Sequence, residues 1–101
     1  MPIALLAISL PALGAGKACE IGQPAKTPQH WQQAEDAALL TRWCRVAQLS
    51  GFHRMDVDKY RDKGWLSVAK ASEQALAACD QERIQLATLL AARGLAPPDC
   101  P

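Results

Sequence analysis

Four cysteines, spread almost evenly along the chain, constrain the fold more than any other feature. They stand 25, 35 and 21 residues apart, and no two of them form a C-x-x-C pair. Structural zinc sites and thioredoxin-type redox motifs use cysteines only about two to four residues apart, so this spacing argues against both. An even number of cysteines in a short exported chain predicts two disulfides, with three possible connectivities. The cysteines are Cys19, Cys44, Cys79 and Cys100.

The first residues of the chain are typical of an export signal. Residues 3–13 read IALLAISLPAL, an apolar run of eleven residues. That is too short for a membrane-spanning helix, which needs about 20, and small residues follow it. We therefore expect residues 1–18 to be a signal peptide, and residues 19–101 to form a single domain in the periplasm or outside the cell. The expected cleavage sites are after Gly14, Ala15 or Ala18.

Two other interpretations of this segment stay open. No Lys or Arg stands between Met1 and the apolar run, although signal peptides usually begin with a positive charge. Residues 3–13 could therefore form a buried helix of a cytosolic protein. A lipid anchor on Cys19 is disfavoured, because Gly16 stands three places before it, where a lipoprotein signal has an apolar residue.

Length, charge and composition restrict the class of protein further. The chain has 101 residues, enough for one small domain but not for a multidomain enzyme. Lys and Arg number 11 against 10 for Asp and Glu, so the chain lacks the positive field of a nucleic-acid-binding protein. Ala occurs 19 times and aromatic residues make up only 5%. This composition favours helices over strands.

Helix-capping residues divide the rest of the chain into three helices. Thr27 is a good N-cap residue and Pro28 suits the first turn, so a helix begins there. Glycines mark the three helix ends, because glycine readily adopts the left-handed conformation that closes a helix. The expected fold class is all-α, a small disulfide-stapled helical hairpin or three-helix domain. The helices are expected over residues 28–49, 57–63 and 65–93, ended by Gly51, Gly64 and Gly94.

The helix expected over residues 65–93 carries a continuous stripe at heptad spacing. Its members alternate four and three residues apart, which places them on one side of a helix. The stripe can pack on the helix over residues 28–49, or it can form an interface with a partner or with a second copy of the chain. Arg83 interrupts the stripe. Its guanidinium is expected either to pair with a carboxylate such as Asp36 or to extend into solvent. The stripe consists of Trp65, Ala69, Ser72, Leu76, Cys79, Arg83, Leu86 and Leu90.

A second apolar face is expected on the helix over residues 28–49. At about 100° per residue, it gathers most of the large apolar side chains of that segment and includes one cysteine, while two arginines point away from it. The face is expected to contain Ala37, Leu39, Leu40, Trp43, Cys44, Val46 and Ala47, with Arg42 and Arg45 outside it.

These two faces suggest a disulfide pairing. In an antiparallel hairpin whose tip is extended by the short helix, Cys44 and Cys79 stand at the same level, at about 1.5 Å per residue. The two remaining cysteines can then meet on the terminal arms. We therefore expect Cys44–Cys79 and Cys19–Cys100, in preference to the local pairs Cys19–Cys44 and Cys79–Cys100.

No catalytic or cofactor motif is recognisable. The two histidines, His30 and His53, stand in a first helical turn and in the expected connector, and no serine or cysteine lies in a nucleophile motif. The six glycines are scattered singly, so no phosphate-binding loop is present. Residues 54–63 mix both signs of charge. We therefore expect no enzyme, no metal site, no cofactor and no nucleic-acid partner.

The function expected from these features is binding to another envelope or secreted protein. An accessory component of an envelope, secretion, conjugation or phage-related system would fit, and so would an inhibitor or immunity protein. A carrier of a small ligand or metal is the alternative, with Trp31, Trp43 and Trp65 around a cavity between the helices. An enzyme using Cys44 or His53 is the least favoured hypothesis. No stable membrane span is expected in the mature form.

Overall fold

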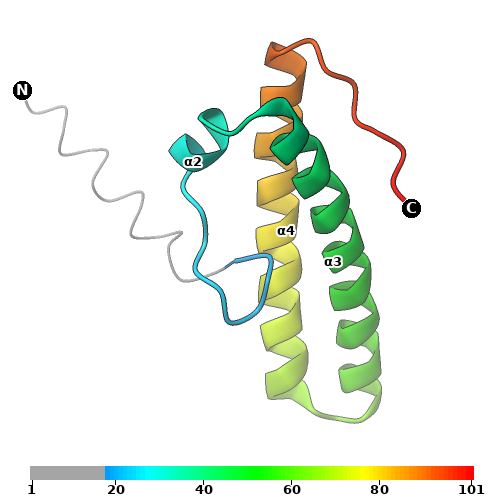
Figure 1. The fold of residues 1–101 in the computed structure, drawn as a ribbon. Coiled ribbons are helices and arrows are strands. Elements are labelled where there is room, and N and C mark those ends of the chain that lie inside the picture. Colours follow the sequence, from blue (N-terminus) through cyan, green and yellow to red (C-terminus); the bar gives the residue numbers. More distant parts are fainter. Residues whose placement is uncertain (1–17) are drawn as a thin grey trace, which may run out of the picture.

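The computed structural model describes residues 18–101, so the predicted signal peptide lies outside the described residues except for Ala18. Three helices follow one another: α2 (Pro28–Gln32), α3 (Asp36–Asp62) and α4 (Leu66–Ala92). The helices α3 and α4 form an antiparallel hairpin, and α2 lies beside its open end (Figure 1). Residues 18–101 contain no strand, which confirms the all-α prediction.

Two arms flank the hairpin (Figure 1). The N-terminal arm, residues 18–27, lies against α4. The C-terminal arm, residues 95–101, turns back after α4 and runs beside α3. Each arm carries one cysteine. The two arms therefore lie on different helices of the hairpin.

The helix expected over residues 28–49 is in fact two helices. Its start is confirmed, because the Thr27 hydroxyl accepts a hydrogen bond from the backbone N–H of His30 at 3.2 Å. The chain then breaks between α2 and α3. Arg93, at the end of α4, donates hydrogen bonds to the backbone carbonyls of Gln32 and Ala34. These bonds satisfy carbonyl groups that a continuous helix would have paired internally.

The predicted helix end at Gly51 and the separate helix over residues 57–63 are both wrong, because α3 continues through Gly51 to Asp62. Glycine inside a helix costs about 1 kcal/mol relative to alanine. Leu49 and Val57, on either side of it, are buried, and their packing offsets that cost.

The other two glycines end helices as expected. Gly64 and Gly94 have φ values of 75° and 70°, in the left-handed region that L side chains rarely adopt. After Gly94, the N–H of Leu95 bonds to the carbonyl of Leu90 at 2.8 Å, which closes α4. The observed α4 therefore agrees with the predicted helix 65–93 to within one residue at each end.

The core lies between α3 and α4. Leu39 and Val46 of α3 meet Leu86 and Leu90 of α4, and all four side chains are buried. Most of the predicted heptad stripe therefore packs inside the domain. No helix in the described part of the chain is both long enough and apolar enough to cross a membrane.

The stripe divides into buried and exposed members. The interface candidates Ala69, Leu86 and Leu90 are buried, and Leu76 is half-buried. In the single chain, Ala69, Leu86 and Leu90 are therefore covered by the domain itself, and Leu76 is partly covered. Trp65 and Arg83 are the exposed members.

Arg83 reaches solvent. Its guanidinium lies 3.7 Å from Asp80 on the same helix, and it does not contact Asp36. Asp36 instead pairs with Arg93 at 2.9 Å. Of the two alternatives for Arg83, solvent exposure is the one the structure shows.

Candidate functional site

Each disulfide joins an arm to the hairpin helix that is farther from it in the sequence. Cys19 of the N-terminal arm bonds to Cys79 of α4, and Cys44 of α3 bonds to Cys100 of the C-terminal arm. The prediction of two disulfides is confirmed. The preferred pairing, Cys44–Cys79 with Cys19–Cys100, is wrong, and so is the alternative of local pairs.

The pairing prediction failed because it placed Cys44 on the wrong side of its helix. Cys44 stands two residues before the fully buried Val46, so at about 100° per residue the two side chains point about 160° apart. Cys44 therefore faces away from α4. Cys79 is completely buried on the inner side of α4, and the two thiols cannot meet.

The predicted helix end at Gly51 also gave wrong positions for Cys44 and Cys79 along the axis of the hairpin. The hairpin turns near Gly64, which places Cys79 level with Leu49. Cys44 then stands five residues further from the turn, about 7.5 Å along the axis. Cys100 reaches it because six residues after Gly94 can span up to about 20 Å when extended.

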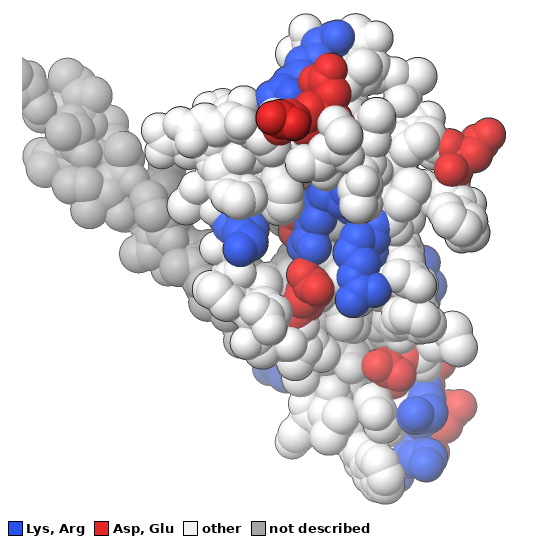
Figure 2. Space-filling model, viewed as in Figure 1, with Lys and Arg blue, Asp and Glu red and all other residues white. Residues whose placement is uncertain are grey.

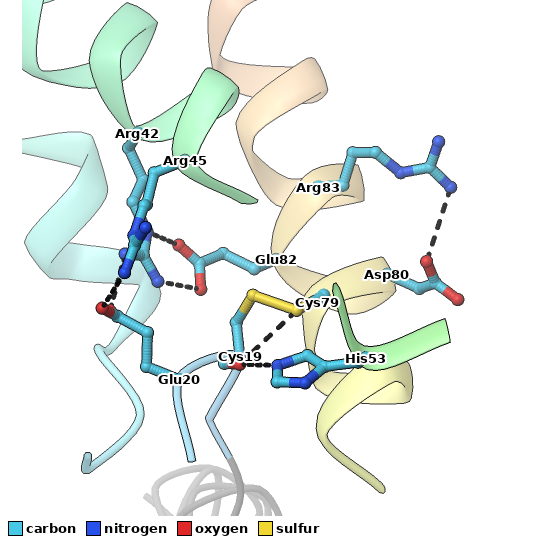
Figure 3. Close-up of a disulfide and its surroundings, with 9 residues drawn as sticks. All are labelled: Cys19, Glu20, Arg42, Arg45, His53, Cys79, Asp80, Glu82 and Arg83. Atoms are coloured by element: carbon cyan, nitrogen blue, oxygen red, sulfur yellow. Dashed lines mark hydrogen bonds and ion pairs between the residues drawn. A yellow bond between two sulfur atoms is a disulfide. The ribbon is translucent and has the colours of Figure 1, made fainter. Parts of the chain in front are cut away.

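The Cys19–Cys79 disulfide is buried where the N-terminal arm meets α4 (Figure 3). Both cysteines are at most 1% exposed. The Nε2–H of His53, on α3, donates a hydrogen bond to the Cys19 carbonyl at 2.6 Å. The other ring nitrogen of His53 is buried and has no hydrogen-bond partner among the described residues. His53 therefore acts here as a structural link between the arm and α3.

An ion-pair cluster lies beside this disulfide (Figure 3). Arg42 of α3 donates two hydrogen bonds to Glu82 of α4, one of them at 2.9 Å, and a third to Glu20 of the N-terminal arm at 2.8 Å. Its guanidinium also lies 5.5 Å from the ring centre of Trp31. Arg42 therefore connects both hairpin helices and the arm, and its hydrogen bond with Glu82 raises the pKa of its guanidinium.

This cluster was missed from the sequence, which indicated a solvent-exposed Arg42. Only 15% of its side chain is exposed. The cluster was missed because the helix was predicted to end at Gly51. When Leu49, His53 and Val57 are counted as part of the same helix, its apolar face turns toward the side of Arg42. The apolar residues that continue at helical spacing beyond Gly51 were the sequence signal that could have revealed the cluster.

Acidification is expected to weaken the attachment of the N-terminal arm. The pKa of Glu20 lies below its ordinary value of 4.5, mainly because its carboxylate accepts a hydrogen bond from Arg42; burial opposes this with a smaller effect. Glu20 therefore contributes stability above pH 4.5, and this contribution is lost as the pH falls through the lowered pKa. Melting temperatures at about pH 6 and about pH 3 should differ less for Glu20→Gln than for the unmodified chain. An equal difference in both proteins would contradict the ion-pair assignment.

Two groups of neighbouring exposed apolar side chains lie on the hairpin within residues 18–101. The first, here called the outer strip, runs along the side of α3 that faces away from α4. Cys44, Gln48, Gly51 and Met55 follow one another at spacings of four, three and four residues, so they share one line of the helix. Phe52 lies next to this line, and Phe52 and Met55 are 50% and 67% exposed.

The second exposed region is the hairpin tip, defined as residues 59–70. Trp65 and Leu66 are both more than half exposed there. Tyr60 stacks on Trp65 with ring centres 5.8 Å apart. The tip therefore presents Trp65, backed by the half-buried Tyr60, and Leu66 to solvent.

The three tryptophans do not gather around one cavity. Trp31 lines two surface hollows, of about 450 and 210 Å³, near α2. Neither Trp43 nor Trp65 lines either hollow. Trp43 packs against the core and Trp65 is at the tip. The structure thus lends no support to a tryptophan-lined carrier cavity.

Among residues 18–101, no three His, Cys, Asp or Glu side chains are grouped as a metal site would require. Basic and acidic side chains intermingle on the face shown in Figure 2. Comparison with protein-family models, curated proteins and solved structures finds no match.

Proposed function

We propose that the protein is exported to the periplasm or outside the cell and acts by binding another envelope or secreted protein. The oxidised state of all four cysteines supports export, because disulfides persist in oxidising compartments. An accessory component of an envelope, secretion, conjugation or phage-related system would act in this way. An inhibitor or immunity protein would use the same kind of surface.

The outer strip is the observation that carries this proposal. Neighbouring exposed apolar side chains often mark a protein interaction site. Phe52 and Met55 are three residues apart on α3, so their side chains are neighbours, and both are at least half exposed. Gly51, beside them, has no side chain, so a partner can approach the helix backbone closely at this point.

The chain itself shows what kind of segment this side of α3 can hold. The C-terminal arm has no helix or strand, and it meets α3 at Cys44, at one end of the outer strip. The strip continues from there toward Met55. We infer that the partner contributes a similar extended segment, placed along the strip beyond the arm.

Site-specific photocrosslinking tests the proposal. A photoreactive residue replaces Met55 on the outer strip or, as a matched control, the exposed Gln81 on α4, and cells that produce the protein are irradiated. A discrete adduct with one protein at position 55 and none at position 81 is expected. Adduct patterns that are the same at both positions, or no adduct at position 55, would contradict binding through the strip.

Gly51→Ala separates binding from stability. A Cβ at this position meets nothing within 4 Å, and the residue has no positive φ. The substitution should therefore stabilise α3 by about 1 kcal/mol, which raises the melting temperature by about 4–8 °C. The same methyl group should reduce the position-55 adduct, because it fills the approach to the backbone. A more stable variant with undiminished crosslinking would show that the partner does not contact Gly51.

A further inference from the structure

The hairpin tip has a composition quite different from that of the outer strip. Residues 59–70 contain four basic side chains and one acidic side chain, whereas the whole chain is nearly balanced. Two of the basic residues, Lys59 and Lys63, lie over the rings of the half-buried Tyr60 and the exposed Trp65. The tip is therefore both the most basic and one of the most apolar parts of the described surface.

The positive charges of the tip are held next to the rings. The ammonium group of Lys59 lies 5.0 Å from the ring centre of Tyr60, and that of Lys63 lies 4.8 Å from the ring centre of Trp65. Arg61 pairs with Glu73. Lys59, Lys63 and Lys70 form no ion pair with any residue in the described range 18–101. Three ammonium groups are thus free to meet an anionic partner.

We propose that the tip docks on an anionic lipid surface, with the lysines at the phosphate headgroups and Trp65 and Leu66 in the interfacial layer. Tryptophan and tyrosine favour the boundary between headgroups and acyl chains. Lysines near an anionic membrane increase partitioning by about fivefold each. Leu66 is 69% exposed, so it can enter the interface without any change of fold.

The shape of the tip favours a membrane over a protein groove as the occupant. The turn at Gly64 is the convex end of an elongated hairpin (Figure 1). Neither of the two surface hollows near α2 includes a tip residue. A projecting basic and aromatic end suits a flat, anionic surface. This contact goes beyond the protein binding proposed for the outer strip and uses different residues.

Binding to lipid vesicles tests the tip directly. The oxidised protein, purified from producing cells, is mixed with vesicles of phosphatidylcholine alone or with an equal part of phosphatidylglycerol. Stronger sedimentation with the phosphatidylglycerol vesicles is expected, together with a shift of tryptophan emission to shorter wavelength. Trp65→Ala should abolish that shift, because Trp31 is buried and Trp43 packs against the core, away from the tip. Equal binding to both vesicles, or an unchanged spectrum, would overturn the proposal.

A matched pair of triple variants separates the tip from overall charge. Lys59→Gln, Lys63→Gln and Lys70→Gln together should weaken binding to anionic vesicles by about 100-fold, at about fivefold per lysine. The control carries Lys26→Gln, Arg54→Gln and Arg83→Gln, which remove the same charge from exposed positions elsewhere. Equal loss in both variants would overturn the assignment to the tip.

The variants keep this proposal separate from the proposed function. The substituted side chains are exposed, so circular dichroism and melting temperature should stay unchanged and serve as the folding check. Crosslinking at Met55 should persist in the tip variant if the outer strip holds the protein partner. Failure to bind vesicles, with the crosslink retained, would overturn lipid docking alone.

Discussion

Replacing Cys19 and Cys79 together by alanine is expected to lower the free energy of unfolding by at least about 4 kcal/mol. The two cysteines are 60 residues apart, and closing a loop of this size in the unfolded chain accounts for about 4 kcal/mol. Both side chains are buried, so their removal also loosens the core around them. A loss of this size is a large fraction of the stability of a small domain.

The second disulfide provides the comparison for this experiment. Cys44 and Cys100 are 56 residues apart, so loop closure alone predicts nearly the same loss for Cys44→Ala with Cys100→Ala. Cys100 is exposed, and its removal leaves no buried gap. Urea unfolding of both double variants should therefore show the larger loss for the Cys19–Cys79 pair. The reverse order would contradict the placement of Cys19 and Cys79 in the core.

The second large effect is expected from Leu86→Ala. Leu86 is completely buried between α3 and α4, and truncating such a leucine costs about 3 kcal/mol. Ile84, two residues away, is 57% exposed and serves as the control. Ile84→Ala should cost no more than about 0.5 kcal/mol.

Urea unfolding of these two variants also decides how the heptad stripe is used. A large loss for Leu86→Ala, the same at low and high protein concentration, means that the stripe packs inside one chain. Small and equal losses for both variants would instead place Leu86 on an outer surface. A loss that depends on protein concentration would indicate an interface between copies of the chain.

Local features of the fold were predictable because they depend on neighbouring residues alone. Thr27 caps α2 through its own hydroxyl, and Gly94 ends α4 because it accepts a positive φ. The helical class follows from the alanine-rich composition, and the two disulfides follow from the number of cysteines. None of these inferences needs to know which helix packs on which.

The wrong disulfide pairing and the missed ion-pair cluster share one origin, the prediction of a helix end at Gly51. Glycine is disfavoured inside a helix and favoured just after one, so local preference alone predicts an end at Gly51. The burial of Leu49 and Val57 on either side of it outweighs that preference. Ending the helix at Gly51 turned the inferred apolar face away from Arg42 and moved Cys44 onto it. As a result, the ion-pair cluster was missed and the disulfide pairing was predicted wrongly.

The break between α2 and α3 has a different cause. The carbonyls of Gln32 and Ala34 are satisfied by Arg93, about 60 residues later in the chain. Short-range sequence patterns cannot predict a contact between residues so far apart in the chain. The exposed tip and outer strip were likewise unpredictable, because exposure depends on which faces α3 and α4 bury against each other.

The central claim is that each terminal arm is bonded to one helix of the hairpin, and peptide mapping without reduction tests it most directly. Trypsin separates the four cysteines into the peptides 18–26, 43–45, 71–83 and 94–101. Mass spectrometry should find 18–26 joined to 71–83, and 43–45 joined to 94–101. Joining of 43–45 to either 71–83 or 18–26 would contradict the structure and the surfaces derived from it.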